Sequence, residues 1–522
     1  MPGDAPTPHG ARTGVVVASL AIALASVAGG LLTARAAIRY RPSLNLVRPG
    51  APPGAATYRP ARLAHRVLLV ICDGLRADTA ARMPFLQSLA SRGASAIAAA
   101  SYPSVSRPNY AAILTGMTPR SSGVRTNDWH APVALDHLGT RLPASGVPVA
   151  LVEDRTHAFA EMFGGTQVID AGGNEAPAVA ESELATMQTT GGLVVLLLLA
   201  ADEAGHAHGG ASQEYAAAAT AIDTTLARLA RSLDLDRDAM VVTADHGHLD
   251  AGGHGGLEPE VLRIPFVLAG AGVERGATIP EAHNVDVAPT VAALLGADAP
   301  AQAEGTTIAG ALSISPDARR ALATADDLRH EENARRSHDF FAAELRSASL
   351  AMGLRAIATL LALGAALLAT RLAHRTGLAH VDAAVAVVAG GLLAADAALL
   401  VVLVGNVPSA SLLPTRHDLL PTLESLFAGA AALSILSPLA ARRAGQPGLF
   451  ARMTGVNAGT TLLGTALAGA AWIASPLASA VVPGPVLIVL PGLALTVAAA
   501  ALLAAPLGLV SAAGATLLRR RA

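Results

Sequence analysis

The chain has 522 residues, of which 52% are hydrophobic and 15% charged, and its formal net charge is −2. The length allows two or three domains, and a composition this apolar, with a mean hydropathy of +0.47, indicates a membrane protein. The near-neutral charge argues against nucleic acid as a partner, and the single cysteine, Cys72, excludes an intrachain disulfide framework and a cysteine-rich zinc site.

The first apolar region lies near the N-terminus, after a short tail (1–12). An uncharged run separates Arg12 from Arg35 and is long enough for about 30 Å of helix. A cleaved signal peptide is the alternative, but the run exceeds the usual apolar core of such a peptide, so we expect an uncleaved transmembrane anchor at 13–34. The aperiodic, Pro/Arg-rich stretch 35–65 is expected to be a linker.

Residues 66–315 have the pattern of an α/β domain. Unbroken apolar runs, typical of strands buried on both faces of a parallel sheet, occur at Val67–Cys72, Leu193–Leu199, Met240–Thr243 and Pro265–Leu268. Helix-like stretches such as Met83–Arg92 and Glu214–Ser232 separate them. The alternation predicts a central, mostly parallel sheet with helices on both faces.

Residues 316–348 are charged and helix-prone, and we expect them to connect this domain to a second membrane region. Residues 349–522 are hydrophobic almost throughout and predict an all-α region of five spans. The five spans are expected near 351–370, 383–404, 425–441, 456–479 and 484–506. Together with the N-terminal anchor they make about six transmembrane spans.

The loop charges predict the orientation of these spans. With six spans both termini share one side of the membrane, and that side carries Arg371, Arg375, Arg442, Arg443, Arg452 and Arg519–Arg521. Arginines concentrate in cytoplasmic loops, so we expect both termini in the cytoplasm and the 66–315 domain outside it, in a cell membrane. Four arginines after the first span, at positions 35, 39, 41 and 48, oppose this, but long translocated domains weaken the rule.

Two segments with chemically useful side chains come early in the domain. Asp73, in ICDGLRAD, directly follows the first apolar run, and a carboxylate at a strand end is a natural metal ligand; simple turn chemistry is the alternative. In YPSVSRPN, Ser104 and Ser106 precede a helix-like stretch whose N-terminus would favour a phosphate group. Helix capping is the alternative interpretation of these serines.

Two later segments combine aspartate with histidine. ADEAGHAHGG (201–210) places Asp202 and His206 after the second apolar run, and such oxygen and nitrogen ligands suit Zn²⁺; an incidental polar loop is the alternative. ADHGHLDAGGHGG (244–256) holds Asp245, His246 and His254, and its density of histidine exceeds what a polar turn requires. The inventory fits two divalent metal ions about 4 Å apart with a hydroxyl nucleophile.

The ordered set DG, PSVSRPN, DEAGH, DHG and GGHGG resembles the alkaline phosphatase superfamily, in its type I phosphodiesterase / nucleotide pyrophosphatase branch, over roughly residues 66–315. The resemblance implies an alkaline-phosphatase-like fold with two metal ions, expected to be Zn²⁺. One ion would be bound by Asp73, Ser106, Asp245 and His246, and the other by Asp202, His206 and His254. Ser106 would be the nucleophile, Asn127 would donate a hydrogen bond to a phosphate oxygen, and Asn109 would be structural.

The layout of the chain is similar to that of the GPI ethanolamine-phosphate transferases, which have an N-terminal anchor, an extracytoplasmic catalytic domain and a multi-span region. The early position of His254 after DHG also resembles those enzymes, whereas PSVSRPN and the position of Asn127 resemble the phosphodiesterases. Sulfatases are set aside, because neither Cys72 nor Ser106 stands in their C/S-x-P-x-R pattern.

The leading hypothesis is an enzyme that cleaves a phosphodiester through a phospho-Ser106 intermediate. Water as acceptor would make it a phosphodiesterase, and an alcohol on a lipid or glycan would make it a head-group transferase. The C-terminal spans favour a lipid- or glycolipid-linked substrate. The alternative is a non-catalytic membrane scaffold or transporter with a degenerate domain, although no expected ligand is missing. Asp396 would line a polar site within its span or mark a span end.

Overall fold

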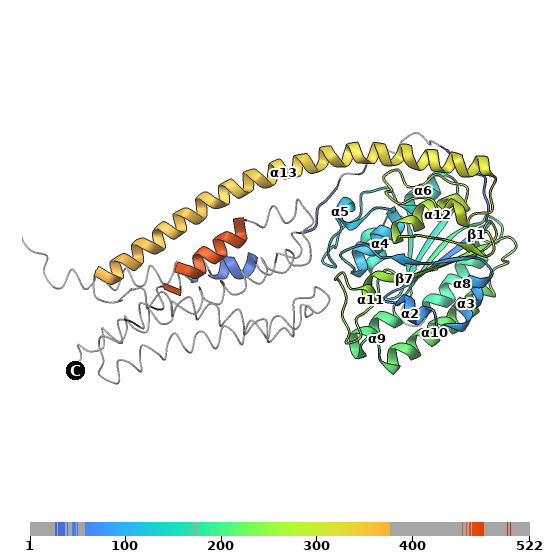
Figure 1. Cartoon of the computed structure of the whole chain (residues 1–522), viewed down its shortest axis with the longest axis horizontal. Coiled ribbons are helices and arrows are strands. Elements are labelled where there is room, and N and C mark those ends of the chain that lie inside the picture. Colours follow the sequence, from blue (N-terminus) through green and yellow to red (C-terminus); the bar gives the residue numbers. More distant parts are fainter. Residues whose placement is uncertain are drawn as a thin grey trace, which may run out of the picture. The chain divides into compact units, whose positions relative to one another are not determined.

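The computed structural model describes residues 27–375, apart from 29, 37–38, 40–43, 49, 51–57, 165 and 172–174. It also describes 452, 456, 459–460, 462–473, 498 and 502. The chain divides into two compact units, of which one contains Leu44–Ala342 and holds the α/β domain (Figure 1).

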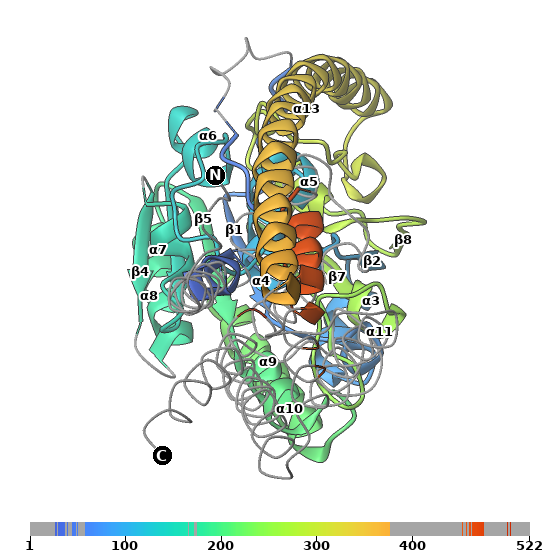
Figure 2. The same ribbon diagram turned by 90° about the vertical axis from the view of Figure 1, so that its left-hand side faces the viewer.

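The domain is built on an eight-stranded sheet with the order β4-β3-β5-β1-β6-β7-β2-β8. Its strands are β1 (Arg66–Cys72), β2 (Ala94–Ala99), β3 (Val149–Glu153), β4 (Gln167–Asp170), β5 (Gly192–Leu198), β6 (Ala239–Thr243), β7 (Arg263–Gly270) and β8 (Ala277–Thr278). Figure 2 shows β4 and β8 at opposite edges. Only β7 pairs antiparallel, with β6 and β2, so the prediction of a mostly parallel sheet is confirmed.

The centre of the sheet is formed by the strands that the apolar runs predicted. Every residue of β1, β5 and β6 is buried, because helices cover both faces there. In the parallel register, Val70 of β1 pairs with Leu196 of β5 on one side and with Val242 of β6 on the other. The carboxyl ends of these three strands therefore meet at one edge of the sheet.

Helices cover the sheet in two layers (Figure 1). One layer contains α2 (Ala77–Ala80), α3 (Pro84–Ser91), α8 (Ala176–Thr186), α9 (Ala200–His208) and α10 (Gln213–Ala230). The other contains α4 (Ser106–Thr115), α5 (Pro119–Ser122), α6 (Leu138–Ala144) and α12 (Val287–Leu294). The short helices α7 (Ala158–Met162) and α11 (Pro259–Leu262) pack against β3 and β7. The predicted α/β architecture with helices on both faces is confirmed.

Part of the stretch expected to be a linker packs on this domain. Leu44 and Arg48 are 2% and 5% exposed. The side-chain oxygen of Asn45 accepts hydrogen bonds from the backbone N–H groups of Arg125 and Thr126, at 2.8 and 3.0 Å. These contacts fix the loop that leads to Asn127.

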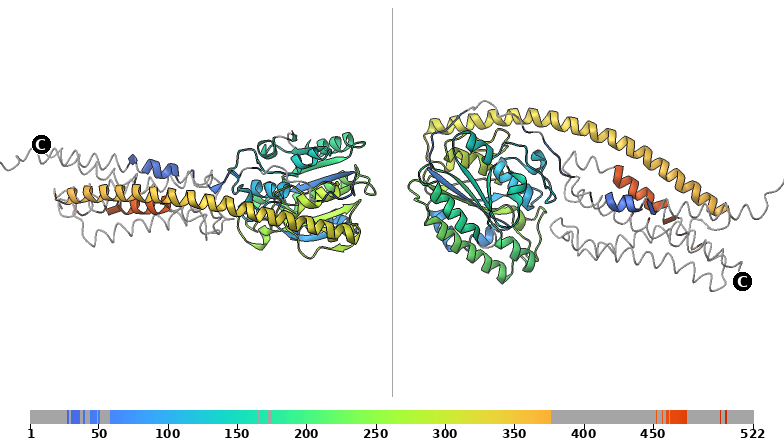
Figure 3. Two further views of the ribbon diagram at one scale, coloured as in Figure 1. Left: turned by 90° about the horizontal axis from the view of Figure 1, so that it is seen from above. Right: turned by 180° about the vertical axis from the view of Figure 1, so that it is seen from behind.

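The helix α13 (Pro316–Arg375) runs without interruption through the predicted connecting segment and the first predicted C-terminal span (Figure 3). Among the described residues, its Pro316–Gly364 portion is the one helix that contains a stretch long and apolar enough to cross a membrane. A shorter apolar helix covers Leu462–Ile473. The spans predicted at 383–404 and 425–441, most of those at 13–34 and 484–506, and Asp396 lie outside the described residues, so the six spans are unconfirmed.

Candidate metal centre

Three aspartates meet at the carboxyl edge of the sheet because they follow three neighbouring strands. Asp73 comes directly after β1, Asp202 lies in the first turn of α9 after β5, and Asp245 follows β6. Gly74 connects them: its N–H donates to Oδ1 of Asp245 at 3.0 Å. Its φ is +71°, and a Cβ there would lie 2.8 Å from Cα of Asp202, so only glycine allows this approach.

The first set of candidate ligands, the Asp73 group, consists of Asp73, Asp245 and His246, all of them buried. Nε2 of His246 lies 3.5 Å from Oδ1 of Asp73 and 3.2 Å from Oδ2 of Asp245. The same nitrogen is 3.3 Å from Oγ of Ser106, the first residue of α4. The structure thus brings together the four residues that the resemblance assigned to one metal ion.

The electrostatics of the Asp73 group suit a cation. Oδ1 of Asp73 and Oδ2 of Asp245 are buried and have no hydrogen-bond partner among the described residues. Burial, together with the charge of Asp245, raises the pKa of Asp73, and burial and the charge of Asp202 raise the pKa of Asp245 to about 7. A divalent ion would compensate the negative charge of these buried carboxylates, which lack hydrogen-bond donors at two of their oxygens within the described part of the chain.

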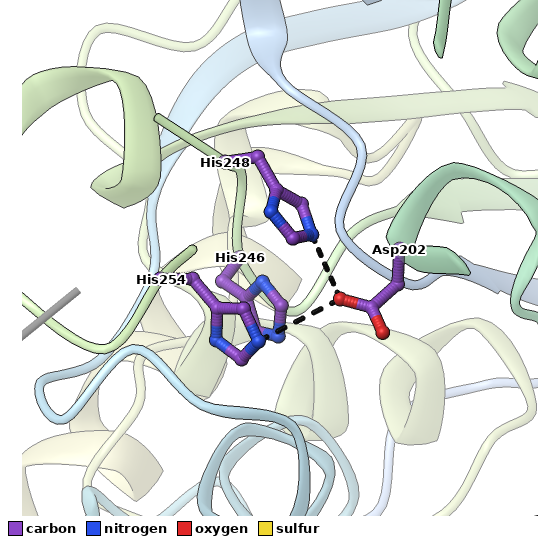
Figure 4. A group of neighbouring side chains, drawn as sticks. All are labelled: Asp202, His246, His248 and His254. Atoms are coloured by element: carbon purple, nitrogen blue, oxygen red, sulfur yellow. Dashed lines mark hydrogen bonds and ion pairs between the residues drawn. The ribbon is translucent and has the colours of Figure 1, made fainter. Parts of the chain in front are cut away.

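A second set of candidate ligands consists of Asp202, His246, His248 and His254. The resemblance assigned Asp202, His206 and His254 to the second ion, and we call these three residues the Asp202 group. Asp202 and His206 are one turn apart on the same face of α9. Oδ1 of Asp202 lies 3.5 Å from Nε2 of His206 and 3.6 Å from Nε2 of His254, and these two nitrogens are 3.0 Å apart. In Figure 4 the imidazoles of His246 and His254 lie against one another, with ring centres 3.8 Å apart, so the two groups are contiguous.

The protonation of His246 and His254 also fits metal binding. Burial lowers the pKa of both, that of His254 to about 4, so both are neutral at pH 7. Nδ1 of His254 is 3.0 Å from the backbone oxygen of Ser104, and Nδ1 of His246 is 3.1 Å from that of Gly247. With the proton on Nδ1, each ring presents the Nε2 lone pair to its group, which is how metal-binding histidines are usually oriented.

The two serines and two asparagines of the motifs have different environments. Oγ of Ser104 is buried and donates to the backbone oxygen of Gly256 at 2.7 Å. Asn109 is buried and its amide bonds to four groups, on Ser101, Pro103, Val105 and Asn284, as a structural residue would. Ser106 is half-buried beside the Asp73 group, and Asn127 is tied to the start of α4 because its Oδ1 accepts the N–H of Arg107 at 3.0 Å.

One buried residue at the centre carries no role in the motif analysis. Nε2 of His248 lies 2.8 Å from Oδ1 of Asp202 (Figure 4). Burial alone would raise the pKa of Asp202, but this hydrogen bond and the neighbouring imidazoles hold it well below its usual range. The only sequence signal was the density of histidine in ADHGHLDAGGHGG. His208, from the other histidine-rich segment, is exposed.

A surrounding network holds the loops that carry these ligands. The guanidinium of Arg76 bonds to Asp78 at 2.9 and 2.8 Å and to Asp250 at 2.5 Å, which joins the turn after β1 to the histidine-rich loop. The hydroxyl of Tyr215, on α10, accepts the N–H of Arg76 and donates to the backbone oxygen of Gly74. Asp223, on the same helix, accepts the first N–H groups of α3. These residues support the centre from outside it.

A mostly parallel sheet with aspartate and histidine side chains grouped at its carboxyl edge is the arrangement expected of a metal-dependent enzyme. The type I phosphodiesterase / nucleotide pyrophosphatase family matches residues 67–145, and the metalloenzyme superfamily matches residues 140–299. Together the two matches cover Asp73, Ser106, Asn127 and both ligand groups. They confirm the predicted resemblance to the alkaline phosphatase superfamily, the predicted class of metal-dependent phosphodiesterases and phosphotransferases, and the use of divalent metal.

Individual proteins are similar in sequence to part of this chain. GPI ethanolamine phosphate transferase 1 of Yarrowia lipolytica is 29% identical over 41% of this chain and 27% of its own length. The Mus musculus protein of that name is 25% identical over 48% and 33%. The chain therefore spans about a quarter to a third of these curated relatives. Murine ectonucleotide pyrophosphatase / phosphodiesterase 5, solved with AMP, aligns at 13% identity and a TM-score of 0.38, over 45% of this chain and 96% of that one.

Proposed function

We propose that the protein cleaves a phosphodiester in two steps, with Ser106 as the nucleophile and two divalent metal ions, expected to be Zn²⁺, as cofactors. The single observation that supports this most is the position of Ser106. Ser106 begins α4, and its Oγ lies 3.3 Å from Nε2 of His246. That nitrogen is also close to two buried carboxylate oxygens that have no hydrogen-bond partner among the described residues. A serine kept only for helix capping would not need this environment.

In this proposal each ligand group holds one ion. The Asp73 group and Ser106 would hold the first, and the Asp202 group the second. When bound, the ions neutralise the charge of the phosphate, lower the pKa of the serine hydroxyl and stabilise the leaving oxygen. Asn127 would donate its amide N–H to a phosphate oxygen, since its Oδ1 is already occupied by the N–H of Arg107.

The chain's own residues account for the bonds made and broken. In the first step, Oγ of Ser106 forms a bond to phosphorus, the P–O bond to the leaving alcohol breaks, and the serine proton ends on that alcohol. The N-terminus of α4 favours the resulting phosphoserine, because its N–H groups and dipole stabilise negative charge. In the second step an acceptor hydroxyl attacks phosphorus, and Ser106 recovers a proton as the P–Oγ bond breaks.

For the acceptor we propose a hydroxyl group on a glycolipid, with a phospholipid as the phosphodiester donor. The similarity to two GPI ethanolamine phosphate transferases supports this choice over water. Three leucines of α13, at positions 350, 354 and 361, are 73%, 71% and 71% exposed, which suits a helix surrounded by lipid. A catalytic domain tethered to a membrane could use a donor and an acceptor that lie in the same bilayer.

We further propose the domain boundaries and topology expected from the sequence: a catalytic domain at 66–315 outside the cytoplasm, and both termini inside. The arginine distribution supports this orientation.

A direct test incubates the purified full-length protein in lipid nanodiscs with a phospholipid labelled in its head group and phosphate. Loss of the labelled head-group phosphate from the phospholipid, stopped by a chelator and restored by zinc, is expected. Recovery of the label on an added glycolipid identifies a transferase, and recovery in solution identifies a hydrolase. Metal-free protein with no turnover on any phosphodiester would instead support the scaffold alternative.

A further inference from the structure

His248 is a fully buried histidine that the proposed chemistry leaves without a role. Its side chain is 0% exposed, and it follows two residues after His246 in the loop beyond β6. Nε2 faces Oδ1 of Asp202 at 2.8 Å. Nδ1 is buried and has no hydrogen-bond partner among the described residues. A buried imidazole with one strong contact and one orphaned nitrogen calls for a functional explanation.

The two ring nitrogens distinguish a ligand from a hydrogen-bond donor. A neutral imidazole carries one N–H and one lone pair, and a metal-binding ring usually donates its other N–H to a nearby oxygen. His246 and His254 meet this condition, because Nδ1 of each lies within 3.1 Å of a backbone oxygen. His248 does not. If Nε2 of His248 bound a metal, its Nδ1–H would be buried without an acceptor among the described residues, which is unfavourable.

The other tautomer makes use of the contact that is present. With the proton on Nε2, His248 donates to a carboxylate oxygen at 2.8 Å, and such charge-assisted hydrogen bonds are the stronger kind. We propose that His248 is a positioning residue, which holds the carboxylate of Asp202 toward His206 and His254 and does not itself bind the metal. This inference rests on the proposed function, in which Asp202 is a ligand.

The packing of α9 supports a fixed position for the ring. Gly205 lies between Asp202 and His206, and a Cβ at this residue would be 2.5 Å from Cδ2 of His248. Glycine is less favourable than alanine inside a helix, so its presence in the helix that carries both ligands calls for a structural reason. The space that it leaves is filled by the imidazole of His248. Helix and ring therefore fit one another at the place where Asp202 is held.

The consequence is measurable as metal affinity. A carboxylate that has lost such a partner can rotate away from the metal, and the loss of an equivalent partner in other metal sites typically lowers affinity 10–100-fold. Only the ion bound by the Asp202 group should be affected, because Asp73 and Asp245 have their own hydrogen bonds, from Tyr110 and from Gly74.

The test compares zinc affinities of full-length variants by competition with a chromophoric chelator. His248→Leu should weaken one of two bound ions roughly 10–100-fold. His248→Gln should keep most of the affinity, since an amide N–H can take the place of Nε2–H. Gly205→Ala, which leaves every ligand intact but displaces the ring, should resemble His248→Leu. His254→Gln is the matched control for a true ligand and should lose the ion. Buried Trp129 reports whether each variant is folded.

The inference would be overturned by the following outcomes. If His248→Gln loses as much affinity as His254→Gln, the residue is a ligand. If His248→Leu and Gly205→Ala bind zinc as the wild type does, the ring only fills space. Wild-type protein that binds no metal would overturn the proposed function as well. Intact wild-type binding and turnover, with no effect of His248→Leu, would overturn this inference alone.

Discussion

Replacement of Asp245 by asparagine should stabilise the metal-free protein while it abolishes metal-dependent turnover. Asp245 is fully buried, and Oδ1 accepts N–H groups from Gly74 and His246, whereas Oδ2 has no hydrogen-bond partner among the described residues. An asparagine keeps both hydrogen bonds through its oxygen. Its NH₂ group would then lie where Oδ2 is now, 3.2 Å from Nε2 of His246, whose lone pair can accept a hydrogen bond.

The magnitude follows from the pKa of Asp245, which burial raises from 3.8 to about 7. A rise of about three pKa units at 1.36 kcal/mol each means that the charged carboxylate destabilises the metal-free fold by at most about 4 kcal/mol. Because the folded-state pKa is the higher one, the full effect is present above pH 7 and is absent below about pH 4. The substitution should therefore raise the Tm by up to about 10 °C at pH 8 and by nearly nothing at pH 4.

The assay is thermal unfolding of the full-length protein in detergent with a chelator, followed by the emission of Trp129. Trp472→Phe removes the other of the chain's two tryptophans, and the exposed Asp236→Asn is the matched control. Adding zinc should make the wild type the more stable of the two proteins, since a ligand at about 1,000 times its Kd stabilises the protein that binds it by roughly 4 kcal/mol. The reasoning would be refuted if the metal-free Asp245→Asn variant unfolded at a lower temperature than the metal-free wild type at pH 8.

Other predictions concern the ligands, the core and the membrane. His254→Ala should lose turnover and, by metal analysis, one zinc ion per chain, while unchanged Trp129 emission shows that it is folded. Retention of both zinc ions would exclude His254 as a ligand. Asp238→Asn should destabilise the domain by about 3–5 kcal/mol in denaturant titrations, because buried Arg66 loses its anionic partner. Burial by itself raises the pKa of Asp238, but Arg66 lowers it overall. The stabilisation by this ion pair is therefore present above about pH 4 and lost below it. A free energy of unfolding that does not fall at acid pH would contradict the pairing. Protease added to intact spheroplasts should cut within 40–345, and protection would reverse the topology.

The sequence predicted the centre of the sheet well because β1, β5 and β6 are buried on both faces. An unbroken apolar run is the direct consequence of that burial. β2 and β4 were not predicted, because they lack such a run. β2 reads ASAIAA and leaves Ile97 61% exposed, and β4 is a four-residue edge strand with exposed ends. Neither leaves a pattern that differs from a helix or a loop.

The candidate ligands could be predicted because each aspartate lies shortly after the end of a strand, and neighbouring parallel strands end at the same edge. The role of His248 could not be predicted in this way. Its contact with Asp202 joins residues 46 positions apart, and the space for its ring depends on Gly205 of another element. The resemblance favours Ser106 over Ser104, and the structure adds that Oγ of Ser104 donates to the backbone oxygen of Gly256.

The central claim is transfer of a phosphoryl group through Ser106, and trapping that intermediate tests it most directly. Full-length protein would be mixed with a phosphodiester labelled at phosphorus, quenched in acid within the first turnover, digested and analysed by mass spectrometry. We predict label on Ser106 in the wild type, and neither label nor turnover in Ser106→Ala. Label on Ser104, or turnover by Ser106→Ala at the wild-type rate, would contradict the account.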